Sequence, residues 1–198
     1  MKGSFNQMVI NHLKKSTPEQ SSLDKQRVER IKVGDSTAFK ELFCAYCQPL
    51  IRFALRFVND VTTAEDVVQD IFLKIWLNRQ QLNPTLNIKS YLYVAVKNQA
   101  LKQRRQQGVR SQGNMIMHLS HQYIPTPEET LNTKEIETTV FQAIKELPDK
   151  CRLIFSMNRF DGLTYAEIAE ILDLSIKTIE TQMGRALKHL RDKLDQYL

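Results

Sequence analysis

Cationic and hydrogen-bonding side chains recur at helical spacing between residues 175 and 194. They are Lys177, Thr178, Thr181, Gln182, Arg185 and Lys188. Lys and Arg side chains bind phosphates, whereas Thr and Gln side chains also hydrogen-bond to base edges. Segment 175–193 holds five cations and two acids, and this excess of positive charge favours a polyanionic partner. The predicted chemistry is recognition of duplex DNA by a helix in the major groove.

Two helices joined by a short turn are expected to position these side chains. Thr164 and Glu167 have the spacing of a capping box at the start of the first helix. Asp173 and Leu174 form the expected turn, and Ser175 caps the second helix. The expected buried face of that helix comprises Ile179, Met183, Ala186, Leu187, Leu190 and Leu194. This pattern is typical of a helix-turn-helix motif, and a hairpin used only for packing is the alternative.

A second basic stretch suits single-stranded nucleic acid. Segment 89–110 holds six cations and no acid, and a helix is predicted over residues 88–106. One flank of this helix carries Tyr91, Asn98, Lys102 and Arg105. Cations bind phosphates while aromatic rings stack on unpaired bases. A solvated basic face is the alternative interpretation.

The predicted helix over residues 63–82 is apolar nearly all round. Val67, Val68, Ile71 and Ile75 form one face. Phe72 and Trp76 lie on another face, and Leu73 and Leu77 on a third, beside Asp66 and Asp70. A small helical domain needs one apolar stripe, so the surplus requires a second packing surface. Either another part of the chain covers this ridge, or a basic partner protein docks on it beside Asp66, Gln69 and Asp70.

Length and composition predict an all-α protein of two small helical bundles joined by a flexible linker. The chain has 198 residues, a formal net charge of +6 and only six glycines. We expect a disordered arm over residues 1–23, a first domain over 24–106, a linker over 107–132 and a helix-turn-helix domain over 133–198. Neither a membrane-spanning run nor a signal peptide is evident, so we expect a cytoplasmic protein without membrane insertion.

Catalytic and metal chemistry are not favoured. The sequence contains no nucleophile–base or phosphate-loop motif, so we expect no enzymatic activity and no cofactor. Cys44 and Cys47 form a C-x-x-C pair, and a zinc site would need His118 and His121 as its other two ligands. Because the cysteines lie in an apolar helical pattern and the histidines in a polar linker, two buried thiols without metal are the preferred interpretation.

Three segments in this order resemble a bacterial RNA polymerase sigma factor of the extracytoplasmic-function group. AEDVVQDIFLKIW at 64–76 is similar to the family's polymerase-binding segment, and IKSYLYVAVKNQALKQRR at 88–105 to its promoter-melting and minus-10 helix. Segment 146–191 is similar to the minus-35 domain. The resemblance implies a factor without chemistry of its own that selects and opens promoters for core RNA polymerase.

The resemblance also implies roles for particular residues. The residues facing the β′ clamp helices of the polymerase would be Asp66, Gln69, Asp70, Phe72 and Trp76. Those holding the minus-10 strand would be Lys89, Tyr91, Lys97 and Asn98, joined by Lys102 and Arg105 and by loop 79–87, which would capture a flipped base. Those gripping the minus-35 duplex would be Lys177, Thr178, Thr181, Gln182, Arg185 and Lys188. Further implied partners are the β flap of the polymerase and an anti-sigma factor.

Several positions depart from the family pattern. Glu180 and Gln182 stand where basic residues are frequent, which would alter base preference because Glu accepts from cytosine and Gln pairs with adenine. Asp173 replaces a frequent turn glycine, at some cost in a left-handed conformation. A free-standing helix-turn-helix regulator is the competing hypothesis, but it requires a dimerisation helix that the sequence does not display.

Overall fold

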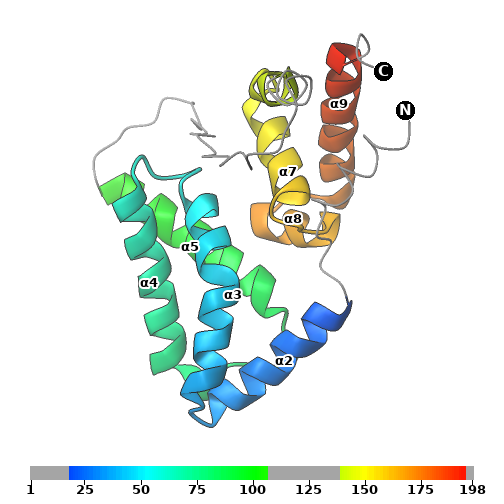
Figure 1. Cartoon of the computed structure of the whole chain (residues 1–198). Helices are drawn as coiled ribbons and strands as arrows, with labels where there is room; N and C mark the ends of the chain where they lie inside the picture. Colours follow the sequence, from blue (N-terminus) through cyan, green and yellow to red (C-terminus); the bar gives the residue numbers. More distant parts are fainter. Residues whose placement is uncertain (1–17, 107–138, 195–198) are drawn as a thin grey trace, which may run out of the picture. The chain divides into compact units, whose positions relative to one another are not determined.

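The computed structural model describes residues 18–106 and 139–194, which form helices and no strand. These residues fall into two compact units, one containing helices α2 to α5 and the other most of α7 to α9 (Figure 1). The expected linker and most of the expected N-terminal arm lie outside the described residues. No helix in the described ranges is long and apolar enough to cross a membrane.

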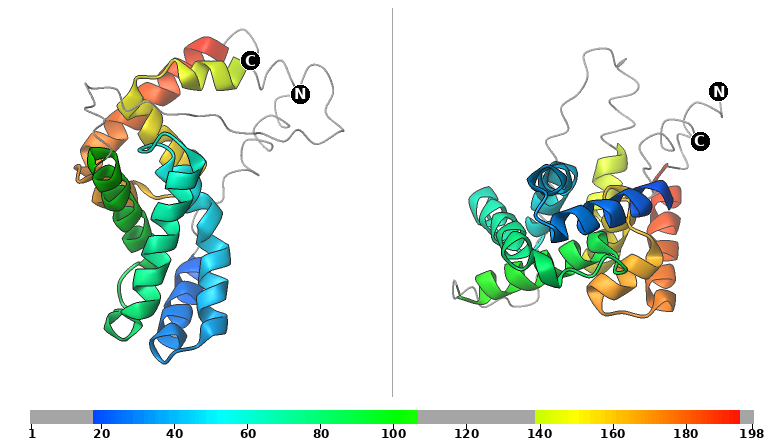
Figure 2. Two further views of the ribbon diagram at one scale, coloured as in Figure 1. Left: turned by 90° about the vertical axis from the view of Figure 1, so that its left-hand side faces the viewer. Right: turned by 90° about the horizontal axis from the view of Figure 1, so that it is seen from below.

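The first unit is a bundle of four α-helices. Its elements are α2 (Pro18–Lys32), α3 (Ser36–Ala54), α4 (Val61–Leu77), the 3-10 helix η1 (Arg79–Gln81) and α5 (Ile88–Gln106). Helices α3, α4 and α5 all pack against one another, and α2 packs mainly along α3 (Figures 1 and 2). Leu42, Phe53, Leu92 and Tyr93 are almost completely buried between them.

Helix α2 begins at Pro18, six residues before the expected start at Asp24, so residues 18–23 belong to a helix and not to a disordered arm. Asp24 does not cap the helix. It is buried, accepts a hydrogen bond from the Tyr46 hydroxyl and pairs with Arg27 at 2.8 Å. Burial is the main reason why the pKa of Tyr46 is raised, and the hydrogen bond to Asp24 adds to it.

Residues close in sequence determine where α2 ends and where α3 and α4 begin. Gly34 ends α2 at φ 91°, and the Asp35 amide donates to the Arg30 carbonyl at 3.1 Å, as in a Schellman motif. Asp35 then caps α3, and the hydrogen bonds that it accepts from the amides of Ala38 and Thr37 lower its pKa. Asp60 caps α4 in the same way through Thr63.

Two helices of this unit differ in extent from what the sequence pattern suggests. Pro49 suggests a kink or a short break, and α3 runs through it without a break. Helix α4 ends at Leu77, and residues up to 82 are not a continuation of it, because the chain tightens into η1. There the Arg79 guanidinium donates to the Trp76 carbonyl at 3.0 Å, which satisfies one of the carbonyls left free at a helix end.

The second unit ends in a helix-turn-helix. Residues 139–145 are helical and are followed by α7 (Asp149–Arg159), α8 (Tyr165–Leu172) and α9 (Ile176–Leu194). The Thr164 amide donates to Glu167 at 2.8 Å and the Glu167 amide to the Thr164 hydroxyl at 3.2 Å, which confirms the predicted capping box. The Thr178 amide donates to the Ser175 hydroxyl at 3.1 Å, so the predicted cap of α9 is also confirmed.

The turn between α8 and α9 is strained at Asp173. Its φ of 54° is the only positive value at a non-glycine residue in the described ranges. The Leu174 amide donates to the Ala169 carbonyl at 2.9 Å and the Asp173 amide to the Glu170 carbonyl at 3.3 Å. These are the two bonds of a Schellman motif, in which position Asp173 normally favours glycine.

Replacing Asp173 with glycine is expected to stabilise the second unit by up to about 1 kcal/mol, because glycine adopts the left-handed conformation without a Cβ clash. The greater flexibility of glycine in the unfolded chain offsets part of this gain. Asp173→Val is expected to destabilise the same unit, and Asp173→Asn to be nearly neutral. Thermal unfolding of the three variants measures the order, and equal midpoints for Gly and Val would contradict a strained turn.

Candidate nucleic-acid interface

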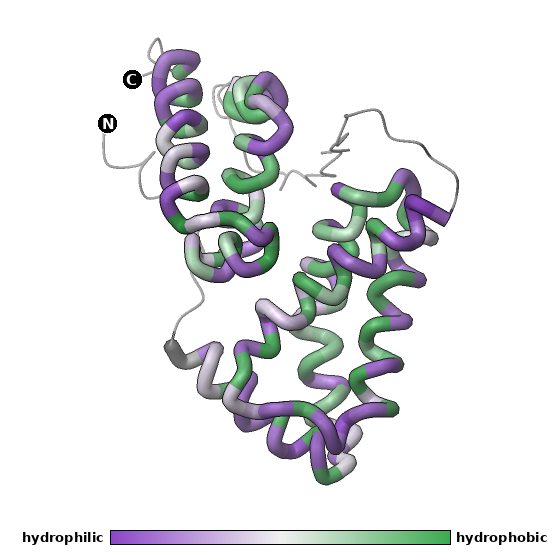
Figure 3. The backbone as a smooth tube through the Cα atoms, turned by 180° about the vertical axis from the view of Figure 1, so that it is seen from behind, coloured by the Kyte–Doolittle hydropathy of each residue, from purple (hydrophilic) through white to green (hydrophobic). Residues whose placement is uncertain are grey.

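The outer side of α9 presents the cations that the sequence indicated. Lys177, Thr181, Arg185 and Lys188 are exposed, while Ile179, Met183, Ala186 and Leu190 pack inward. Figure 3 shows hydrophilic residues along the outer side of this helix, next to the C-terminal mark, and hydrophobic ones on its inner side. Within the described residues, none of the three cations forms an ion pair. Their charge is therefore available to an external anion.

Three further residues of α9 differ from the expected outward or inward placement. Thr178 is half-buried, and its hydroxyl lies 2.8 Å from the Ser175 hydroxyl. Gln182 is also half-buried, and its backbone carbonyl accepts from the Cys151 thiol at 3.1 Å. Leu187, expected in the core, is 39% exposed, because it lies on the flank of α9, about 60° around the helix from Leu190.

Four residues of the predicted single-strand set share the outer face of α5. Tyr91 is 48% exposed, and Asn98, Lys102 and Arg105 are exposed too. Separations of seven, four and three residues place them on one side of a helix. Lys89 and Lys97 are half-buried and lie elsewhere around α5. The structure therefore divides the predicted set into one exposed cluster and two separate lysines.

Phe72 is not on the outer face of α4, so its expected exposure as a docking residue is wrong. Its side chain is 2% exposed, and its ring lies 4.9 Å from Phe43 and 6.0 Å from Phe39. Trp76 is half-buried, 5.0 Å from Phe39, with the Arg79 guanidinium 4.9 Å from its ring. The two phenylalanines of α3 thus supply the burial partner that the sequence left open.

The exposed side of α4 is formed by residues of mixed character, which we call the α4 outer face. It comprises Asp66, Gln69, Asp70, Leu73 and Leu77. The two leucines are 55% and 66% exposed and take the place expected for Phe72. An apolar strip edged by carboxylates suits a partner with apolar and basic side chains.

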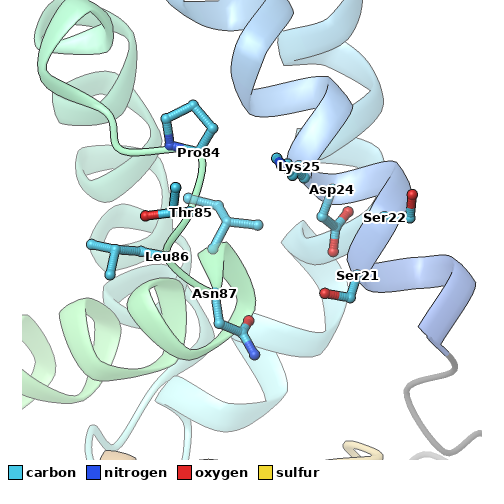
Figure 4. A pocket seen from close by; sticks show the side chains of 9 residues that line it. Ser21, Ser22, Asp24, Lys25, Pro84, Thr85, Leu86 and Asn87 are labelled. Carbon is cyan, nitrogen blue, oxygen red and sulfur yellow. The ribbon is translucent and has the colours of Figure 1, made fainter.

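A polar cleft of about 500 Å³ lies in the first unit between α2 and the loop before α5 (Figure 4). Its walls include Ser21, Ser22 and Lys25 on α2, and Thr85, Leu86 and Asn87 on the loop. The Asn87 side chain accepts from the Ser90 amide at 3.2 Å, which orients the side chain at the cleft. The loop is part of the site that the sequence predicts, but Ser21 and Ser22 of the α2 wall fall in residues 1–23, which the sequence assigns to the arm.

No group of three or more metal-ligating side chains occurs in the described parts of the chain. Cys44 is exposed and Cys47 is half-buried, and burial raises the pKa of the Cys47 thiol. His118 and His121, the other members of the weighed zinc site, lie outside the described residues. The two cysteines alone do not make a structural zinc site.

Comparison with known families assigns the two units to two regions of the same protein family. The model of sigma-70 region 2 matches residues 42–110, and that of sigma-70 region 4 matches residues 139–190. The chain is 28% identical over 184 residues to RNA polymerase sigma-H factor of Pseudomonas aeruginosa, covering 88% of this chain and 93% of that protein. It is 26% identical over 179 residues to the ECF RNA polymerase sigma factor SigW of Bacillus subtilis, covering 86% and 96%. The chain belongs to the extracytoplasmic-function sigma factors.

A solved sigma factor has the same fold. The sigma factor RpoE of Bartonella quintana, in complex with the anti-sigma factor NepR, aligns with a TM-score of 0.55 and 24% identity. The alignment covers 79% of this chain and 96% of that one. Family membership establishes that this sigma factor binds core RNA polymerase and promoter DNA, directs transcription initiation and has no enzymatic activity of its own.

Proposed function

We propose that the two units divide the work of this sigma factor between opened and intact DNA. Residues 24–106, preceded by α2 residues from 18 onward, bind the polymerase and the minus-10 element, and residues 133–198 bind the minus-35 element. Segment 107–132 links them. The support is the presence of one exposed cationic helix face in each unit, on α5 and on α9.

The α4 outer face is proposed to dock on the β′ clamp helices of the polymerase. Asp66, Gln69 and Asp70 supply polar contacts, while Leu73 and Leu77 replace Phe72 as the apolar anchors. A few residues at the desolvated centre of an interface supply most of its binding energy, and charges at the rim guide association. Trp76 contributes by holding Arg79 and Phe39 in place beneath this face. A contact between the second unit and the β flap is proposed on family resemblance.

The exposed cluster of α5 is proposed to hold the melted minus-10 strand. Lys102 and Arg105 would bind phosphates, Tyr91 would stack on an unpaired base and Asn98 would hydrogen-bond to a base edge. Lys89 and Lys97 would add charge from the sides. The cleft between α2 and the loop would receive a flipped base, since its serine, threonine and asparagine side chains can hydrogen-bond to one.

The outer side of α9 is proposed to grip the minus-35 duplex through Lys177, Arg185 and Lys188. Gln182 would contact a base edge, and Thr181 would offer only its hydroxyl oxygen as an acceptor, because its proton is donated to the Lys177 carbonyl. Thr178 would contribute mainly by capping α9, because its hydroxyl is engaged by Ser175. We also propose an anti-sigma factor as partner, as in the RpoE–NepR complex, and action in the cytoplasm, where core polymerase works.

The single observation that carries this proposal is the exposed face of α5, which holds cations and no acid. A transcription assay with holoenzyme tests the proposal. Holoenzyme assembled from this chain and core polymerase is expected to open and transcribe promoters that it selects from a randomised duplex library. Permanganate reactivity of minus-10 thymines reports the opening. Tyr91→Ala with Arg105→Ala should reduce opening at least tenfold, since each lost stacking contact costs about 1–3 kcal/mol.

A matched control removes a cation from another helix of the first unit. Lys40→Ala in α3 changes the net charge equally, at an exposed residue outside the proposed interface, and should leave opening unchanged. Equal loss of opening in the control and in the double variant would contradict the proposed role of α5.

A further inference from the structure

Gly184 lies in the middle of α9, where no contact among the described residues requires a glycine. It is exposed, and its backbone is helical without a positive φ. Apart from its two chain neighbours and the adjacent backbone of α9, no atom of the described residues lies within 4 Å of the position that a Cβ would take. Glycine is the least favourable residue in a helix interior after proline, because it loses most conformational freedom. Neither packing in the described units nor backbone geometry explains the glycine.

The surroundings of Gly184 indicate what comes close to it. The neighbours one turn before and after it on the same side of α9 are Glu180, Thr181, Leu187 and Lys188, and all four are exposed. The Thr181 hydroxyl donates to the Lys177 carbonyl at 2.8 Å, so this side chain turns back along the helix. At the centre of the cationic side of α9, Gly184 therefore leaves the helix backbone without a Cβ to cover it.

We propose that the duplex approaches the backbone of α9 most closely at Gly184, which acts as a positioning residue for minus-35 recognition. The inference rests on the proposed function of α9. The major groove is about 12 Å wide, and a helix reaches base edges only as deeply as its own side chains permit. Without a Cβ at the centre, Lys177 and Lys188 reach phosphates on either side. Glu180 comes within reach of a cytosine amino group.

The test uses full-length protein in holoenzyme, with the wild-type protein, Gly184→Ala and Arg185→Ala compared. The probes are a promoter fragment selected by the wild-type holoenzyme and the same fragment with its upstream element scrambled. Gly184→Ala is expected to raise the unfolding midpoint of the second unit by roughly 2–8 °C, because alanine favours the helix. It should weaken binding to the intact fragment roughly 5- to 100-fold, as overpacking does.

Each outcome separates the inference from the function on which it rests. Greater stability with weaker binding to the intact fragment only would support the inference. Unchanged binding by Gly184→Ala, with weakened binding by Arg185→Ala, would overturn the inference and leave the function of α9 standing. Unchanged binding by both variants would overturn both. A lowered unfolding midpoint would overturn the inference, because the position would then not be open to a Cβ. An equal loss of affinity for both fragments would also overturn it, because Gly184 would then not contact the upstream element.

Discussion

Replacing Phe72 with alanine is expected to lower the free energy of unfolding of the first unit by about 3–5 kcal/mol, the range typical of a buried aromatic side chain. The ring is 2% exposed and makes edge-to-face contacts with Phe39 and Phe43. Those contacts are lost with it. Urea denaturation followed by tryptophan fluorescence measures this unit alone, because Trp76 is the single tryptophan of the chain.

The adjacent residue provides the control. Leu73 is 55% exposed, so Leu73→Ala should change stability by less than about 1 kcal/mol while weakening binding to core polymerase. Phe72→Leu, which keeps most of the buried volume, should still fold and bind. If Phe72→Ala left stability unchanged and abolished polymerase binding, Phe72 would be a docking residue, as its sequence position first indicated.

Removing Arg185 and Lys188 together should weaken binding of the holoenzyme to upstream duplex roughly 30-fold at 0.15 M salt. Each phosphate contact contributes about 0.9 to the slope of log affinity against log salt, so the double alanine variant should flatten that slope by about 1.8 units. Both side chains are exposed on α9, and neither has an ion-pair partner within the described residues. Affinity measured at several salt concentrations gives the slope.

Lys193 is the matched control for this prediction. It lies on the same helix but pairs with Glu146 at 2.8 Å, and its hydrogen bond is the main reason why the pKa of Glu146 is lowered. Lys193→Ala removes one charge from the flank of α9 and should leave the salt slope unchanged. An unchanged slope in the double variant would show that the C-terminal half of α9 does not contact the DNA phosphates.

Helix caps were predictable because they depend on residues close in sequence. Asp35, the Thr164–Glu167 pair and Ser175 each satisfy free amides within three positions of themselves. The same locality explains Gly34, whose positive φ ends α2. The start of α2 was missed because Asp24 looks like a cap, whereas its carboxylate is bound by Tyr46, 22 positions away.

The side of a helix that faces the core was predictable only where one side is apolar. The sequence by itself determined the all-α class, the helix-turn-helix and the exposed cationic faces of α5 and α9, since charged side chains remain in water. In α4 nearly every side is apolar, so helical periodicity cannot choose between Phe72 and Leu73. The tertiary structure made that choice because Phe39 and Phe43 of α3 cover one side of α4, which leaves Leu73 and Leu77 outside.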